Sequence, residues 1–204
     1  MEDLPVISSA GSGDISTVTG LSDDTLLVMF AKGDRQAVVE LTNRLGPRTY
    51  AVALRVLGNR AEAEDVAQET MIRLWRMAPD WQQGQAKVST WLYRVTLNLC
   101  LDIKRRKKPL DIDAVPEPED SAPGPADRLQ DAARHDALQA ALMLLPDRQR
   151  EAVVLRHIEE LSNPEIAGIM DISVEAVESL TARGKRALAK ALADRRAELG
   201  YGDD

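Results

Sequence analysis

The 204-residue sequence predicts an all-α protein made of two small helical domains. Apolar residues recur at helical spacing through most of the chain, and each periodic stretch ends in turn residues. Aromatic residues make up only 3% of the sequence, and glycine and proline are few outside two segments, which favours helices over a β-sandwich. One of those segments, residues 109–129, is acidic and rich in proline, so we expect it to be a linker between the domains.

Domain boundaries follow from these changes in composition. Residues 1–21 are small and polar with glycine interruptions, so we expect a disordered N-terminal extension there. The first helical domain is expected at residues 22–108 and the second at residues 130–195, which leaves a tail at residues 196–204.

The net charge of −7 is unevenly distributed. Residues 26–108 carry 15 basic and 8 acidic side chains, a balance of +7, whereas residues 1–25 carry five acids and no base. Residues 109–137 carry 2 bases and 8 acids, a balance of −6. A positive domain between acidic segments suits a protein that binds polyanions through that domain and repels them with the rest of its surface.

Several function classes are excluded by what the sequence lacks. Cys100 is the only cysteine, so no intrachain disulfide and no Cys/His metal set are expected, and His135 and His157 are isolated. The sequence has no paired catalytic carboxylates, no nucleophile–base set and no phosphate loop, so we expect neither an enzyme nor a cofactor. No apolar run approaches membrane-spanning length and no secretory signal is present, so a cytoplasmic protein is expected.

Three helices are expected at the start of the first domain. Ser22-Asp23-Asp24 is a helix-start signal, and the helix that follows should end at Gly33-Asp34. Gly46-Pro47 predicts a break in the next periodic stretch. The second and third helices are therefore expected at Arg35–Leu45 and Arg48–Leu57.

The fourth helix, Ala61–Met77, has an unusual outer flank. Ala63, Val66 and Leu74 lie on its inner face, while the flank mixes carboxylates, an amide, an aliphatic and a cation. Such a mixture is typical of a face that docks another protein. From the charges alone, the solvated face of an ordinary helix is the favoured interpretation.

A long helix is expected from about Ser89 to Lys107. Trp91 and Tyr93 lie near its start and a Lys/Arg run ends it, before Pro109. Aromatic rings stack on unpaired bases while cations hold phosphates, so this helix suits single-stranded or splayed nucleic acid. The alternative is that the rings, Trp91 in particular, belong to the core and that the basic run is a solvated helix end.

The second domain ends in a predicted helix-turn-helix. Helices from about Arg128 to Leu145 and from Pro146-Asp147 to Ile158 precede it. Ser162 and Glu165 have the spacing of a capping box, and Ser173 can cap the second helix. That helix has a buried stripe and a basic second half, as in helices that enter the major groove. An ordinary helical hairpin with a solvated basic face remains the alternative.

These stretches resemble the extracytoplasmic-function (ECF) type of bacterial sigma factor, of the sigma-70 family. Domain two of that family is resembled by A-E-D-V-A-Q-E-T-M-I-R-L-W (Ala63–Trp75) and S-T-W-L-Y-R-V-T-L-N-L-C-L-D-I-K-R-R (Ser89–Arg106). Domain four is resembled by L-P-D-R-Q-R-E-A-V-V-L-R (Leu145–Arg156) and L-S-N-P-E-I-A (Leu161–Ala167). The similarity covers roughly residues 22–108 and 130–193, and both motif sets occur in the family's order across an acidic linker.

The resemblance implies a promoter-specificity subunit of RNA polymerase that acts in a stress response. The implied partners are core polymerase (the clamp of the largest subunit and the flap of the second-largest), promoter DNA and an anti-sigma factor, without membrane insertion. The implied polymerase-binding residues are Asp65, Gln68, Glu69, Ile72 and Arg73. The implied −10 residues are Lys87, Ser89, Thr90, Trp91, Tyr93, Arg94, Asn98, Arg105 and Arg106. The implied −35 residues are Ser173, Glu175, Ala176, Glu178, Ser179, Thr181, Arg183, Lys185 and Arg186.

The chain departs from the family pattern at two places in the helix-turn-helix. Asp171 stands in the turn where the family often has glycine, and aspartate tolerates the left-handed conformation. Glu178 stands where the family often has lysine and, with Glu175, makes the front of the recognition helix acidic. We therefore expect an unusual −35 element and weak binding to DNA without polymerase.

A stand-alone helix-turn-helix regulator, whose N-terminal domain is only a dimerisation or sensing bundle, is the alternative function. The long aromatic and basic helix and the D-x-x-Q-E flank distinguish the two, because a plain regulator needs neither.

Overall fold

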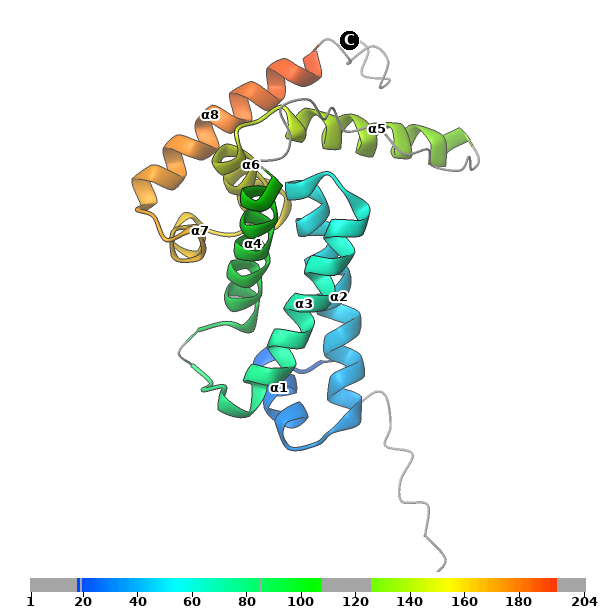
Figure 1. Ribbon diagram of the computed structural model, residues 1–204, viewed down its shortest axis with the longest axis vertical. Helices are drawn as coiled ribbons and strands as arrows, with labels where there is room; N and C mark the ends of the chain where they lie inside the picture. Colours follow the sequence, from blue (N-terminus) through cyan, green and yellow to red (C-terminus); the bar gives the residue numbers. More distant parts are fainter. Residues whose placement is uncertain (1–17, 19, 85, 108–125, 194–204) are drawn as a thin grey trace, which may run out of the picture.

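In the computed structural model, the described residues, 18, 20–84, 86–107 and 126–193, form two helical bundles without a strand (Figure 1). Side chains are described from residue 134 onward in the second bundle. The expected N-terminal extension, linker and tail lie almost wholly outside these residues. No helix in the described ranges is long and apolar enough to cross a membrane.

Helices α1 to α4 make up the first bundle. They span Asp23–Ala31, Arg35–Leu57, Arg60–Met77 and Val88–Lys107, with a short 3₁₀ turn at Ala78–Asp80 after α3. Side chains cap the N-termini of α1 and α3. Thr25 N–H donates to Ser22 Oγ at 3.2 Å, in agreement with the predicted helix start, and Glu62 N–H donates to Asn59 Oδ1 at 3.0 Å, a cap that was not predicted. One apolar cluster, which includes Leu26, Leu41, Leu74 and Leu92, holds the α1 end of this bundle together.

The predicted break at Gly46-Pro47 is wrong, because α2 runs unbroken from Arg35 to Leu57. A proline inside a helix costs about 3 kcal/mol, chiefly through one lost backbone hydrogen bond. Burial of one continuous stripe on both sides of Pro47 outweighs that cost. The stripe consists of Ala37, Leu41, Leu45, Thr49, Val52, Ala53 and Val56.

Helices α5 to α8 make up the second bundle. They span Ala126–Met143, Asp147–Val153, Asn163–Met170 and Val174–Ala193. The helix expected to run through Ile158 instead changes at Val154 into a π-helical turn, Val154–Ile158, which buries Val154 and Leu155. This turn leads into the helix-turn-helix formed by α7 and α8.

The helix-turn-helix is built as predicted. Ser162 N–H donates to Glu165 Oε2 at 3.0 Å, which is the Glu half of the capping box. Asp171 adopts the left-handed conformation, with φ 52° and ψ 54°. Ala176 N–H donates to Ser173 Oγ at 3.2 Å, so Ser173 caps α8. Val177 is fully buried, and Leu180 and Leu188 pack partly buried against the core.

The two bundles share one apolar core. Val52, Val56 and Tyr93 from the first bundle belong to the same buried cluster as Leu142 and Ile166 from the second. In Figure 1, α7 lies beside α4, and α6 lies above the ends of α2 and α4. Part of the surface of α4 that faces away from its own bundle is therefore covered.

Arg150, on α6, joins the two bundles at one end of the contact between them, which we call the seam. Its side chain is only 4% exposed. Its guanidinium donates to the carbonyls of Leu142, Met143 and Leu145 at 2.7, 3.0 and 2.8 Å, and to that of Val56 in α2 at 2.8 Å. A single buried cation thus ties the end of α5 to the end of α2.

Gly184 allows α8 to pack closely on α6. Substitution of this glycine tests that contact. A Cβ at this position would lie 2.5 Å from Val153 Cγ2 and 3.1 Å from the Gln149 carbonyl oxygen. We expect Gly184→Ala to lower the free energy of unfolding by about 1–3 kcal/mol through overpacking, less about 1 kcal/mol regained from helix propensity. Urea unfolding followed by circular dichroism measures the change.

Gly168→Ala is the matched control, because nothing lies within 4 Å of a Cβ at this helical position. It should stabilise the protein by about 0.5–1 kcal/mol. Equal effects from both substitutions would contradict the close contact between α6 and α8.

Candidate polymerase-binding and promoter-binding surfaces

The outer flank of α3 presents an apolar side chain among polar ones. Ile72 is 42% exposed, and Asp65 and Gln68 on the same flank are exposed as well. Glu69 is half-buried and accepts from Arg73 Nε at 2.7 Å, one helical turn away. All five residues predicted to bind polymerase thus come together on one face, with an aliphatic centre and a hydrogen-bonding rim.

Helix α4 carries the residues predicted to act on the −10 element, and its two aromatic residues differ in exposure. Trp91 is half-buried against the cluster at the α1 end. Tyr93 is fully buried, and its hydroxyl donates to Glu159 Oε2 at 2.5 Å. Burial and this hydrogen bond raise the pKa of Tyr93 above its usual value. In this arrangement Tyr93 is therefore not free to stack on a base. It belongs to the core, as the alternative interpretation expected of both rings, whereas Trp91, which that interpretation named in particular, is only half-buried.

Two predicted −10 cations contact the second bundle. Lys87 Nζ lies 2.7 Å from Glu165 Oε1, and Arg94 donates to the carbonyl oxygen of Gly168 in α7. The hydrogen bond from Lys87, together with those from Ser162, lowers the pKa of Glu165 to about 2. Glu165 therefore stays ionised opposite Lys87 throughout the physiological pH range.

The remaining −10 candidates are open to solvent to different degrees. Ser89 and Thr90 are half-buried, whereas Asn98, Arg105 and Arg106 are exposed. Arg105 and Arg106 lie in the last turn of α4, where cations also complement the helix dipole.

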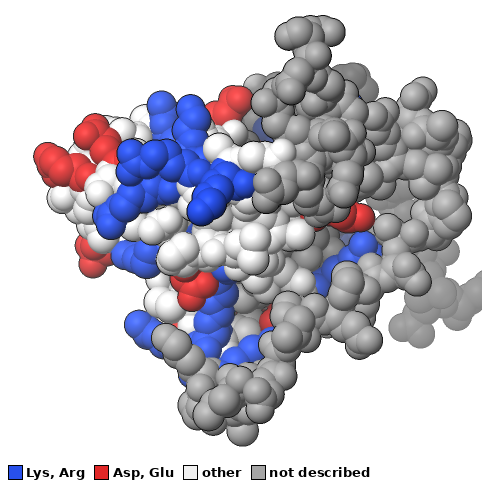
Figure 2. Space-filling model, turned by 90° about the horizontal axis from the view of Figure 1, so that it is seen from above, with Lys and Arg blue, Asp and Glu red and all other residues white. Residues whose placement is uncertain are grey.

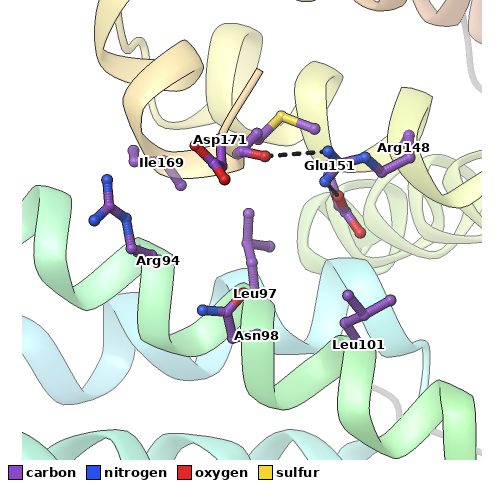
Figure 3. A pocket seen from close by; sticks show the side chains of 9 residues that line it. Arg94, Leu97, Asn98, Leu101, Arg148, Glu151, Ile169 and Asp171 are labelled. Atoms are coloured by element: carbon purple, nitrogen blue, oxygen red, sulfur yellow. Dashed lines mark hydrogen bonds and ion pairs between the residues drawn. The ribbon is translucent and has the colours of Figure 1, made fainter.

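A groove of about 320 Å³ remains between α4 and the second bundle (Figure 3). Arg94, Leu97, Asn98 and Leu101 form its α4 wall. The opposite wall consists of Arg148, Glu151, Ile169, Met170 and Asp171. Arg148 holds that wall together by donating to the Met170 carbonyl at 3.1 Å and to Glu151 Oε2 at 3.2 Å. The seam between the bundles is thus incompletely filled beside the residues predicted to bind DNA.

Helix α8 exposes most of the predicted −35 residues. The exposed residues are Ser173, Glu175, Glu178, Ser179, Arg183, Lys185 and Arg186, while Ala176 is half-buried. Figure 2 shows Lys and Arg side chains gathered on the top face of the molecule, where α8 runs. Arg183 folds back on Ser179, donating to its Oγ at 2.7 Å, and Glu178 accepts from Asn163 Nδ2 at 3.4 Å.

Thr181 differs from the exposed −35 candidates, because it is half-buried. Its hydroxyl oxygen is buried and has no hydrogen-bond partner among the described residues. On α8, position 181 follows Val177 by one turn, so it lies toward the core side of the helix rather than the exposed side.

Two acceptors on the second bundle were missed by the sequence reasoning. Glu159 accepts from Tyr93 and from Arg48 Nε, the latter at 3.0 Å, and Glu165 was expected only to cap α7. Their partners lie 66, 111 and 78 positions earlier in the chain. No local pattern signals contacts over such separations.

The fold and these surfaces define a two-domain, helix-turn-helix protein of the transcription apparatus. Two family models match the chain: Sigma-70 region 2 over residues 41–109, and Sigma-70 region 4 over residues 135–188. The ECF RNA polymerase sigma factor SigE of Mycolicibacterium smegmatis is 38% identical over 179 residues, which are 84% of this chain and 68% of that protein. The ECF RNA polymerase sigma factor SigW of Bacillus subtilis is 36% identical over 174 residues, which are 80% of this chain and 92% of that protein.

Solved structures agree with these relatives. CnrH, in complex with the cytosolic domain of CnrY, matches with a TM-score of 0.62 and 26% identity over 84% of this chain and 97% of that one. The sigma factor RpoE of Bartonella quintana, in complex with the anti-sigma factor NepR, matches with a TM-score of 0.59 and 25% identity over 74% of this chain and 93% of that one.

The chain belongs to the ECF sigma factors of the sigma-70 family. It is an alternative sigma factor that directs transcription initiation. A stand-alone regulator with an N-terminal dimerisation bundle does not account for the region 2 match over residues 41–109.

Thr181→Val tests the placement of the buried hydroxyl. Valine has nearly the same shape and removes a polar group that has no partner, so we expect the free energy of unfolding to rise by about 1 kcal/mol, measured by urea unfolding. Ser179→Ala, on the exposed side of α8, should change it by no more than about 0.5 kcal/mol. A folded Thr181→Val protein with lower affinity for promoter DNA would instead indicate that Thr181 contacts DNA.

Proposed function

We propose that this sigma factor binds core RNA polymerase through the outer flank of α3, opens the −10 element with α4 and reads the −35 element with α8. The observation that carries this proposal is the exposed Ile72 among Asp65, Gln68 and Glu69. A single exposed aliphatic side chain is common at a protein surface, but one set among carboxylates and an amide on the same helix face gives the mixed character of a docking face. The clamp of the largest polymerase subunit is the proposed partner of this face, and the flap of the second-largest is that of the second bundle.

The proposed −10 surface combines cations with side chains that can contact an unpaired base. Lys87, just before α4, and Arg94 and Arg105, on α4, supply positive charge, and Asn98 supplies an amide that can read a base edge. Flipping a base out of the duplex costs a few kcal/mol, so the surface must offset that cost with stacking and phosphate contacts. Trp91 is half-buried and is the aromatic side chain available for stacking in this arrangement.

The proposed −35 reader is the exposed face of α8. Glu175 and Glu178 lie at its front, and a carboxylate there can accept from cytosine N4 in the major groove. Arg183, Lys185 and Arg186 follow and suit contacts to phosphate. The two functional units are residues 22–108 and 130–195, and the protein acts in the cytoplasm without catalytic groups of its own.

An anti-sigma factor is the proposed regulator. The sigma factor RpoE of Bartonella quintana, which resembles this chain, was solved in complex with the anti-sigma factor NepR, and CnrH was solved with the cytosolic domain of CnrY. We propose that release from such a regulator answers a stress signal.

In vitro transcription with purified core polymerase tests the function. Added to core enzyme, the protein should produce transcripts that start at a small set of upstream regions and are absent with core alone. Mapping the transcript start sites after overexpression identifies those templates. Holoenzyme that yields no promoter-dependent transcript from any of the mapped regions would refute the proposal.

Substitutions on α3 test the polymerase contact. We expect Asp65→Ala with Glu69→Ala, and separately Ile72→Ala, each to weaken core binding by about tenfold or more, the scale of a binding hot spot. Fluorescence anisotropy of labelled protein titrated with core measures the affinity. Because these side chains are at the surface, the urea midpoint should hardly move.

Asp102→Ala and Val39→Ala serve as matched controls. Asp102 is an exposed aspartate on α4, and Val39 is 59% exposed on α2. Both variants should bind core like the unmodified protein. A uniform loss across all four variants would show that the α3 flank has no special role.

A further inference from the structure

We propose that Glu178, on α8, selects cytosine at one base pair of the −35 element, and that Asn163, at the start of α7, is the positioning residue that holds the Glu178 carboxylate in place. This inference rests on the proposed role of α8 as the reader of that element. It gives the acidic front of α8 a defined base preference, and it gives α7 a part in the choice of promoter.

A contact between the two helices of the helix-turn-helix holds Glu178. Asn163 Nδ2 donates to Glu178 Oε1 at 3.4 Å, across 15 positions of the chain. Asn163 is half-buried, whereas Glu178 is exposed on the outer face of α8. The capping box between Ser162 and Glu165 fixes the start of α7, from which the amide projects. Because a carboxylate has about four lone-pair sites, one bond from Asn163 orients it and leaves other sites for a base.

Neighbouring polar side chains at the front of α8 are held by their own helix instead. Glu175 accepts from its own backbone N–H and from Ser173, so its carboxylate lies at the helix start. Ser179 Oγ accepts from Arg183 Nη2 at 2.7 Å. Of Glu175, Glu178 and Ser179, Glu178 is thus the residue whose side chain is oriented by another helix.

Helix α8 itself gains little from the charge of Glu178. The helix begins at Val174, so Glu178 lies beyond the first turn, where the stabilisation of an acid by the helix dipole has faded. Glu178 also follows the like charge of Glu175 by one turn, which slightly destabilises a helix, and it repels DNA phosphate. Recognition of a base accounts for a carboxylate at this unfavourable position.

The chemistry of a carboxylate favours cytosine in the major groove. An ionised carboxylate accepts hydrogen bonds and donates none, and the base donors in this groove are cytosine N4 and adenine N6. Adenine presents the acceptor N7 beside N6, which repels a carboxylate, whereas cytosine presents no acceptor beside N4. Guanine and thymine present acceptors alone. A G·C pair with its cytosine toward Glu178 is therefore the preferred pair.

Substitution of Glu178 tests the base preference in the holoenzyme. The templates carry a promoter mapped by in vitro transcription, in which each base pair of the −35 element is replaced in turn by the other three, and sequencing counts the transcripts. With the unmodified protein, one position should favour cytosine by about tenfold. Glu178→Gln should change the preferred base at that position to adenine, because an amide pairs with adenine N6 and N7. Glu178→Ala should leave the four bases there within about twofold of one another.

Glu175→Gln is the matched control, because it makes the same change of charge one helical turn earlier on the same exposed face. It should leave cytosine preferred at the position that Glu178→Gln alters. The Glu178 variants should keep the urea midpoint of the unmodified protein, since the side chain is exposed.

Asn163→Ala tests the positioning contact with the same templates. It should weaken the preference for cytosine by about threefold without changing the preferred base, because a freely rotating carboxylate must be ordered on binding. Asn163→Asp keeps the shape but sets a second carboxylate against Glu178, so it should weaken the preference at least as much. In a Glu178→Ala background, Asn163→Ala should cause no further change at this position. A merely structural Asn163 would instead lower transcription from all templates alike.

The outcomes separate this inference from the proposed function. Promoter-dependent transcription in which no −35 position favours cytosine, or in which Glu178→Gln keeps the preferred base of the unmodified protein, would overturn the role of Glu178 and leave the sigma factor function standing. A switch to adenine in Glu178→Gln with a full cytosine preference in Asn163→Ala would overturn the role of Asn163. Holoenzyme without any promoter-dependent transcript would refute the proposed function, and this inference with it.

Discussion

The arrangement of the two bundles depends on one buried guanidinium. Arg150 satisfies three carbonyls where α5 ends, at Leu142, Met143 and Leu145, and a fourth at Val56 near the end of α2. Carbonyls at helix ends have no partners within their own helix, so each needs an outside donor. Burial lowers the pKa of Arg150, which nevertheless remains charged because the pKa of arginine starts far above neutrality. Lysine could not replace it, since an ammonium has three donors and no planar fork.

The contacts between α4 and the second bundle follow from this fixed end of α6. Asp147 lies one turn before Arg150, contacts it at 3.2 Å and also pairs with Lys104 of α4. With the α6 end held there, the π-helical turn and α7 come to lie along the length of α4, and Glu159 and Glu165 reach Tyr93 and Lys87. The position of two carboxylates against the proposed DNA-binding surface is therefore a consequence of how one arginine closes two helix ends.

The parts of the fold that could be predicted from sequence are those with local causes. The capping box at Ser162, the left-handed Asp171 and the cap at Ser173 each depend on residues within three positions, and all three were predicted. Gly46-Pro47 was misread because the local cost of a proline is visible in the sequence, whereas the buried stripe that outweighs it is a property of the packed bundle. The burial of the Thr181 hydroxyl could not be predicted for a related reason: the helical period places this residue near the boundary between faces, and the packing of α8 decides on which side the hydroxyl falls.

The candidate sites show the same division between local and distant causes. The shared face of Asp65, Gln68 and Ile72 could be predicted from their spacing on one helix, and the structure brings those residues together on an exposed face. The spacing alone did not indicate a partner for that face. The contacts that cover Tyr93 and Arg94 of α4 could not be predicted, because their acceptors in the second bundle lie far away in the chain. A motif can indicate which residues contact DNA, but whether they are available depends on the domain that packs against them.

The acidic front of α8 explains why such a protein would use two domains. A hydrogen bond from its own backbone N–H, with one from Ser173, lowers the pKa of Glu175, so its charge persists at neutral pH. That charge suits the helix N-terminus but repels nearby phosphate. A recognition helix of this kind gains specificity at the cost of affinity, and it can hold DNA only when another contact keeps it near the promoter. Docking through α3 would supply that contact by raising the effective concentration of α8 at the DNA.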